Sequence, residues 1–100
     1  IILFQKMNIY LIVNPFAGMK KGNRILKEVE DIFQKYNIKY KIAKTEYQGH
    51  AKKLIKNLNL EDFDKLCVIG GDGTMHEVVN GLLTRKDKVQ LPIGSPYRPQ

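Results

Sequence analysis

The fold is decided by one stretch, Leu66-Cys67-Val68-Ile69-Gly70-Gly71-Asp72-Gly73-Thr74-Met75-His76-Glu77. Its apolar start is rich in β-branched residues and predicts a buried parallel strand over 66–70. The three glycines that follow allow positive φ angles and let a ligand approach the backbone closely. Thr74 and Glu77 have the spacing of a capping box, which predicts that a helix begins immediately after the turn. An anion site is expected there, because unpaired N–H groups and the helix dipole point outward from a helix N-terminus.

A turn without a ligand is the simplest alternative, since glycines are common between strands and helices. Asp72 argues against this alternative. A carboxylate on a phosphate-binding turn repels the phosphate unless a metal ion or a proton-transfer step accounts for it. His76 lies inside the predicted helix and has no metal-ligand partner four residues further on, so no metal-binding pair is expected.

Composition limits the classes of protein and partner. With 100 residues, of which 43% are apolar, the chain makes one small domain. Its net charge of +7 favours an acidic partner, such as a nucleotide, an anionic lipid or a nucleic acid. Nucleic acid is the weakest of these, because the lysines are dispersed and no nucleic-acid-binding motif is present. The single cysteine, Cys67, excludes an intrachain disulfide and is expected to pack in its strand.

The chain alternates between apolar segments and amphipathic ones. Strands are predicted at 9–13, 38–44, 66–70 and 89–93, and helices at 23–36, 50–58 and 74–83. The first helix should bury Ile25, Leu26, Val29, Ile32, Phe33 and Tyr36 and end near Asn37, and the last should bury Met75, Val78, Val79, Leu82 and Leu83. Lysines alternate with apolar residues in the second strand, as is typical of a sheet edge.

This βαβαβαβ order predicts an α/β fold: a three-layer, Rossmann-like parallel sheet with helices on both faces. The expected strand order is 2-1-3-4, which places the loops at Asn14 and Gly70 side by side. Open sheets of this class bind ligands at such an edge. Near the first loop, Lys20, Lys21 and Arg24 are either phosphate-neutralising groups or a solvated surface. His50 either touches a ligand or, more simply, caps its helix or hydrogen-bonds loop carbonyls.

Three segments resemble the diacylglycerol kinase catalytic-domain family, which includes diacylglycerol, ceramide and sphingosine kinases. They are Asn14-Pro15-Phe16-Ala17-Gly18; Thr45-Glu46 with Gly49-His50-Ala51; and Gly70-Gly71-Asp72-Gly73-Thr74 with Glu77-Val78-Val79-Asn80-Gly81-Leu82. The resemblance covers roughly residues 8–94. The glycine-aspartate turn alone is shared with NAD kinases and the phosphofructokinase-like group, whereas its extension through Leu83 is similar to the sphingoid branch of the lipid kinases.

The resemblance implies ATP as phosphoryl donor, Mg²⁺, and the hydroxyl of a membrane lipid as acceptor. It implies that the nucleotide is surrounded by Asn14, Pro15, Phe16, Thr45, Glu46, Tyr47, Gln48, Gly49, Gly70, Gly71, Gly73, Thr74 and Glu77. Asp72 is then the catalytic residue, either as the base on the acceptor hydroxyl or as the organiser of metal and phosphate. Either role fits phosphoryl transfer, which depends on positioning and charge neutralisation more than on covalent help.

The sequence departs from the family after residue 94. There a second glycine-containing nucleotide loop is replaced by Ser95-Pro96-Tyr97-Arg98-Pro99-Gln100. Residues 1–94 are thus expected to be an incomplete kinase domain and 95–100 a divergent tail, without the β-rich lipid-binding domain. The alternatives are a non-catalytic nucleotide-binding fragment and a relative of the NAD kinases. Because no apolar run approaches the roughly 20 residues of a membrane span, we expect a cytoplasmic protein. The membrane lipid acceptor that the resemblance implies adds the expectation of peripheral membrane association.

Overall fold

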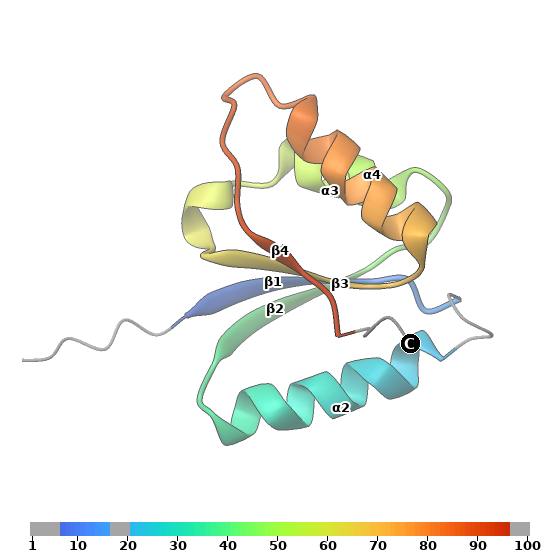
Figure 1. The fold of residues 1–100 in the computed structure, drawn as a ribbon, viewed down its shortest axis with the longest axis vertical. Helices are drawn as coiled ribbons and strands as arrows, with labels where there is room; N and C mark the ends of the chain where they lie inside the picture. The colour runs from blue at the N-terminus through green and yellow to red at the C-terminus, as the bar shows by residue number, and fades with distance from the viewer. Residues whose placement is uncertain (1–6, 17–20, 97–100) are drawn as a thin grey trace, which may run out of the picture.

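The sheet has four parallel strands in the order β2-β1-β3-β4, in a computed structural model that describes residues 7–16 and 21–96 (Figure 1). The strands are β1 (Asn8–Val13), β2 (Lys39–Lys44), β3 (Lys65–Ile69) and β4 (Ile93–Gly94). The helices are α2 (Gly22–Lys35), α3 (His50–Asn57), the short 3-10 helix η1 (Leu60–Asp62) and α4 (Asp72–Leu83). The predicted α/β class and strand order are confirmed, with β2 at one edge.

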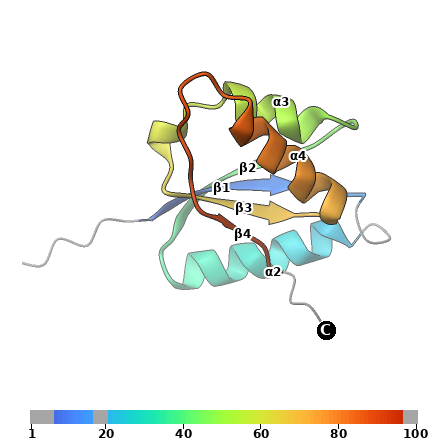
Figure 2. The ribbon, with the colours of Figure 1, turned by 45° about the horizontal axis from the view of Figure 1, so that its top comes forward.

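Helices cover both faces of the sheet, which makes the predicted three layers. α3 and α4 lie on one face and α2 lies on the other (Figures 1 and 2). Side chains alternate between the two faces of a strand, so β1 contributes to both cores. Tyr10 and Ile12 pack on the α3–α4 side, whereas Leu11 and Val13 pack on the α2 side. All four are buried, which makes β1 the centre of the fold.

The register of β1 against its neighbours brings three strand ends to one level. Val13 lies opposite Lys44 of β2 and Ile69 of β3. One residue further on, the Asn14 N–H donates to the Ile69 carbonyl over 2.8 Å. The Thr45 N–H likewise donates to the Val13 carbonyl over 2.8 Å. The loops after β1, β2 and β3 therefore leave the sheet side by side at its carboxyl edge, as predicted.

Asn37 ends α2, as the sequence predicts. Its φ of 56° lies in the left-handed region, which asparagine tolerates better than most residues. The Asn37 N–H donates to the Gln34 carbonyl over 3.2 Å. The Ile38 N–H donates to the Phe33 carbonyl over 2.8 Å, and the two bonds together form a Schellman motif. This stop lets the chain turn back directly into β2.

The apolar faces of α2 and α4 are narrower than predicted. Four residues assigned to those faces are exposed: Ile32, Tyr36, Val79 and Leu83. The buried members are Leu26, Val29, Val78 and Leu82. A helix that packs on a sheet buries one stripe of its surface, and apolar residues beside that stripe stay in contact with solvent.

The predicted fourth strand is present but shorter and shifted. Of the predicted range 89–93 only Ile93 lies in β4, which consists of Ile93 and Gly94, paired with Leu66 and Cys67. Val89 and Leu91 still pack on the α3–α4 core, without strand pairing.

The connection between α3 and β3, where the sequence predicts neither a helix nor a strand, contains η1, whose Leu60 is 1% exposed. A single turn of 3-10 helix is too short to give a periodic signal.

Cys67 lies in β3 and is half-buried against the α2 side of the sheet. Burial raises the pKa of its thiol to about 11, against a smaller lowering by Lys65. The thiol therefore stays protonated at neutral pH, in line with a packing role.

Within residues 7–16 and 21–96, no helix has the length and apolar character to span a bilayer.

Arg85 is a buried structural residue in the charged segment Thr84-Arg85-Lys86-Asp87-Lys88, which the sequence predicts to be a loop. Its side chain is 8% exposed, and its Nη1 donates to the carbonyls of Ile55 (2.7 Å), Lys56 (3.2 Å) and Leu58 (2.6 Å). Nε and Nη2 donate to the two oxygens of Asp87 at 3.0 and 2.6 Å. The guanidinium thereby satisfies carbonyls at the C-terminal end of α3 and ties them to the end of α4.

The ion pair between Arg85 and Asp87 predicts that the stability of the fold depends on pH. The hydrogen bond from Arg85 lowers the pKa of the Asp87 carboxyl, and the bond from the Val89 N–H lowers it further. Ionised Asp87 therefore stabilises the fold above its unfolded-state pKa of about 3.9, and this contribution is lost as the pH falls through the lower folded-state value. We expect urea unfolding to show a steeper loss of stability between about pH 5 and 2 for the wild type than for Asp87→Asn. Equal pH dependence in the two proteins would contradict the assignment.

Candidate functional site

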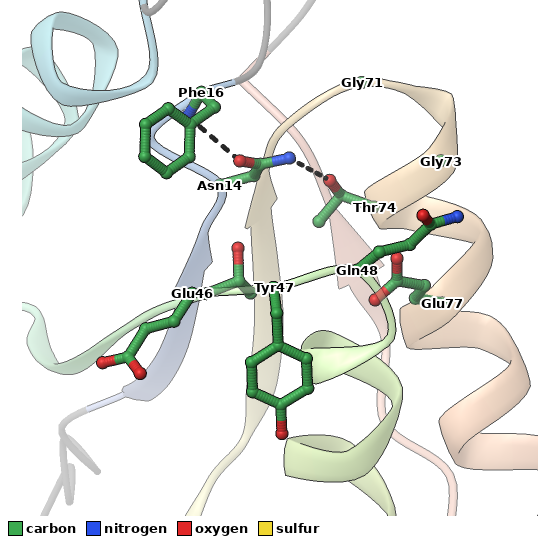
Figure 3. Close-up of a pocket in the computed structure, with 10 residues that line it drawn as sticks. Asn14, Phe16, Glu46, Tyr47, Gln48, Gly71, Gly73, Thr74 and Glu77 are labelled. Atoms are coloured by element: carbon green, nitrogen blue, oxygen red, sulfur yellow. Dashed lines mark hydrogen bonds between the residues drawn. The ribbon is translucent and has the colours of Figure 1, made fainter.

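A cavity of about 380 Å³ opens where the loops after β1, β2 and β3 meet, and its size is typical of small-ligand pockets (Figure 3). It is lined by Asn14, Phe16, Thr45, Glu46, Tyr47, Gln48, Gly71, Gly73, Thr74 and Glu77. All ten belong to the residues that the sequence singled out. The cavity is the place where the parallel strands direct their loops, which follows from the register of β1.

Asn14 links the first loop to α4. Its Nδ2 donates to the Thr74 hydroxyl oxygen over 3.3 Å, and its Oδ1 accepts the Phe16 N–H over 3.0 Å (Figure 3). The second bond is the short-range turn that asparagine side chains make with their own backbone two residues on. The Phe16 ring is 68% exposed while it borders the cavity. An apolar ring that lies open at a cavity is suited to contact a ligand.

Gly22 fixes the position of this first loop, and the sequence analysis missed it. A Cβ on Gly22 would lie 2.4 Å from the Asn14 carbonyl oxygen and 3.0 Å from the Pro15 Cα. The first residue of α2 therefore packs directly on the loop backbone, where only glycine fits. Glycine near a helix start is common, so no sequence signal distinguishes this position from an ordinary one.

The second loop is held at Thr45 and at His50. Thr45 is buried, and its hydroxyl donates to the Val13 carbonyl over 3.4 Å. The Glu46 N–H donates to Nδ1 of His50 over 3.0 Å, and the Tyr47 and His50 rings stack with centroids 4.4 Å apart. Gly49 has a φ of 93°, which requires glycine at the start of α3. His50 thus bonds within its own loop, although to an N–H group and not to a carbonyl.

The predicted capping box is wrong. α4 begins at Asp72, its N-cap is Gly71, and no side chain caps it. Thr74 is already inside the helix, where its hydroxyl accepts from Asn14. Glu77 Oε1 accepts the Ala51 N–H over 3.2 Å, so Glu77 caps α3 and not its own helix. The two residues therefore connect α4 to the first and second loops.

The three glycines of the turn differ in the space around the position where a Cβ would lie. A Cβ on Gly70 would lie 2.6 Å from the Thr74 hydroxyl, so packing requires glycine there. Gly71 and Gly73 would meet nothing within 4 Å, and none of the three has a positive φ. The sequence interpretation of a positive-φ turn is therefore wrong. Gly71 and Gly73 both border the cavity, and without side chains they leave the backbone at the start of α4 open to the close approach of a ligand.

Among the described residues that line the cavity, the charged side chains are the acidic ones of Glu46 and Glu77, with no lysine or arginine. Lys21 and Arg24 of the predicted basic cluster are exposed, and Lys20 lies outside the described residues. The backbone N–H groups at the start of α4 have no side-chain cap and are available as donors to an anion.

Four of the predicted site residues do not line the cavity: Pro15, Gly49, Gly70 and Asp72. Asp72 is exposed at the first position of α4, between the two glycines that do line it. Among residues 7–16 and 21–96, no group of three or more His, Cys, Asp or Glu side chains is arranged to hold a metal ion. The fold and the cavity define an α/β domain with a ligand site at a strand–glycine turn–helix junction.

Comparison with known proteins identifies the family. The sequence model of the diacylglycerol kinase catalytic domain matches residues 8–95, and the chain belongs to this family. The chain is 38% identical over 96 residues to sphingosine kinase 1 of Arabidopsis thaliana, a match that covers 92% of this chain and 20% of that protein. It is 36% identical over 88 residues to human sphingosine kinase 2, covering 84% of this chain and 14% of the relative.

A solved structure has the same fold. A diacylglycerol kinase from Bacillus anthracis strain Sterne superposes with a TM-score of 0.70 at 27% identity, covering 93% of this chain and 33% of that one. The chain thus spans about a fifth or less of these two sphingosine kinases and a third of the bacterial structure. The relatives are lipid kinases, which agrees with the predicted family.

Proposed function

We propose that the chain is the nucleotide-binding part of an ATP-dependent lipid kinase. The observation that carries this proposal is the pair Gly71 and Gly73, which border the cavity and expose the backbone where a Cβ would meet nothing within 4 Å. A triphosphate placed there would accept hydrogen bonds from the N–H groups at the start of α4, aided by the helix dipole. Membership of the diacylglycerol kinase family supports ATP as the ligand.

In this proposal the chain's own residues bind and orient the nucleotide. The α4 N-terminus receives the phosphates, and the exposed rings of Phe16 and Tyr47 provide apolar surface for the nucleoside. Asn14 and Glu77 keep the first and second loops at fixed positions relative to α4. These contacts hold reacting groups in place, which is the main requirement of phosphoryl transfer.

Mg²⁺ fits this arrangement as a companion of the nucleotide. Glu46 and Glu77 at the cavity and Asp72 beside it would repel a bare triphosphate. When bound, Mg²⁺ supplies neutralisation of the phosphate charge, and it is commonly held by substrate phosphates, waters and one or two carboxylates. The carboxylates of this chain could then hold it together with the phosphates, without a dedicated protein cage.

Asp72 is proposed as the catalytic residue. It stands at the first turn of α4, exposed beside the phosphate position, and could act as base on an acceptor hydroxyl or as organiser of metal and phosphate. The acceptor is a membrane lipid, either a sphingoid base or diacylglycerol, because the relatives are named sphingosine and diacylglycerol kinases. A peripheral, cytoplasmic location and a separate lipid-binding domain belong to the same proposal.

The test of this function offers labelled ATP with sphingosine, diacylglycerol or ceramide to the complete product of the gene that encodes this chain. We expect one lipid to be phosphorylated, and Asp72→Asn to lower kcat by at least about a hundredfold, the scale of a lost general base. Lys86→Gln, an exposed substitution away from the cavity, should leave kcat unchanged. Equal transfer by wild type and Asp72→Asn would remove Asp72 from the chemistry.

A nucleotide-binding fragment without transfer activity is the second candidate. The position of Asp72 outside the cavity lining favours it. The 100-residue chain alone is expected to bind ATP and to transfer little or no phosphate to lipid. Lipid phosphorylation at full rate by this chain alone would rule out that separation of binding and transfer.

A further inference from the structure

We propose that His50 is a positioning residue that sets the geometry of the second loop for the nucleotide. This inference rests on the proposed nucleotide site. The loop residues Glu46, Tyr47 and Gln48 line the cavity. His50 does not line that cavity, so its effect on a ligand would pass through the loop.

Three contacts join His50 to the two loop residues that precede Gln48. The His50 Nδ1 accepts the Glu46 N–H over 3.0 Å, and the backbone N–H of His50 donates to the Tyr47 carbonyl over 3.1 Å. Its ring stacks on the Tyr47 ring, with centroids 4.4 Å apart and planes 10° from parallel. One side chain therefore fixes both the backbone at Glu46 and the ring direction at Tyr47.

The loop has few other attachments beyond Thr45. Thr45 is anchored to the Val13 carbonyl through its N–H and its hydroxyl. Glu46, Tyr47 and Gln48 are all exposed, so burial does little to hold them. Without the Nδ1 acceptor, the Glu46 N–H would turn to water and the loop would lose its specified shape.

The direction of the hydrogen bond defines what the loop needs from residue 50. Because the Glu46 N–H points at Nδ1, this nitrogen is the acceptor. The loop therefore needs an acceptor at this position and, beside it, a ring for the Tyr47 stack.

Two substitutions separate the contacts. In His50→Asn the side-chain oxygen stands where Nδ1 stands, so the acceptor stays while the ring is lost. In His50→Phe the ring stack on Tyr47 stays while the acceptor is lost. Both keep the backbone N–H that donates to the Tyr47 carbonyl. Melting temperatures of both variants check that the fold is retained.

The experiment measures the exchange of the Glu46 amide hydrogen by NMR and the affinity for MgATP by calorimetry, on the 100-residue chain at pH 7.5. We expect the wild type and His50→Asn to protect the Glu46 amide, and His50→Phe to lose that protection. His50→Phe should bind MgATP about fivefold more weakly than the wild type, the scale of one hydrogen bond, whereas His50→Asn should keep most of the affinity.

Two results would contradict the role of His50 while leaving ATP binding intact: an unprotected Glu46 amide in the wild type, or equal affinity in all three proteins. A wild type that binds no MgATP overturns the proposed function instead. In that case His50 is still judged by the Glu46 amide, whose protection in wild type and His50→Asn but not in His50→Phe supports the loop anchor.

Discussion

Gly71→Asp is expected to abolish ATP binding without unfolding the protein. Gly71 is the N-cap of α4, with φ −84° and ψ −170°, a conformation that any residue adopts. Nothing lies within 4 Å of the position of its Cβ. An aspartate there would accept from the free N–H groups of the first turn, which keeps or raises stability by a few tenths of a kcal/mol. The same carboxylate would occupy and repel the phosphate site, so we expect affinity for MgATP to fall by at least about a hundredfold, or about 2.7 kcal/mol.

Two companions isolate the cause. Gly71→Asn caps the helix without a charge and should weaken binding less than Gly71→Asp. Gln90→Asp adds one negative charge at an exposed position before β4, at the opposite edge of the sheet, and should leave affinity unchanged. Calorimetry gives the affinities and thermal unfolding gives the stabilities. If Gly71→Asp binds MgATP as tightly as the wild type, the phosphates do not lie at this turn.

Arg85→Met is expected to cause the largest loss of stability. Methionine replaces the apolar stem but leaves the carbonyls of Ile55, Lys56 and Leu58 without their donor. Because a buried polar group left without a partner costs about 1–3 kcal/mol and water can reach part of this site, we expect a total loss of about 3 kcal/mol. For a chain of this length, that loss lowers the melting temperature by roughly 10–20 °C.

Arg85→Lys tests the geometry, because an ammonium cannot replace a planar fork that serves carbonyls and a carboxylate together. We expect it to recover less than half of the lost stability. Lys86→Met, at the exposed neighbouring residue, is the matched control and should change stability by less than about 0.5 kcal/mol. If Arg85→Met is as harmless as this control, Arg85 does not hold the end of α3.

The fold could be predicted well because its signals are local patterns along the chain. Continuous apolar runs predict β1 and β3, and the alternation of lysines with apolar residues predicts β2 at the sheet edge. The features that it missed depend on contacts between distant residues. Leu60 of η1 and the guanidinium of Arg85 are buried only because α3, β3 and α4 converge on them. The charges around Arg85 predict a loop but not its burial, because its partners are backbone carbonyls, which no sequence pattern marks.

The site shows the same division. Ten of the residues that the resemblance implies at the nucleotide line one cavity, because the loops after parallel strands meet at one edge of the sheet. The capping box failed because Thr74 and Glu77 bond to other elements, at Asn14 and Ala51. Gly22 could not be recognised, since its need for glycine comes from the Asn14 carbonyl across the loop.

The most direct test of the nucleotide site is an NMR titration of the isotope-labelled chain with MgATP, followed at the backbone amides. The account predicts saturable shifts at Gly71, Gly73 and Thr74 and in the loop 45–48, where N–H groups and side chains surround the cavity. Amides on the opposite edge of the sheet, such as Gln90, should stay unchanged. Absence of saturable shifts, or shifts confined to surfaces away from the α4 N-terminus, would contradict a nucleotide site at this turn.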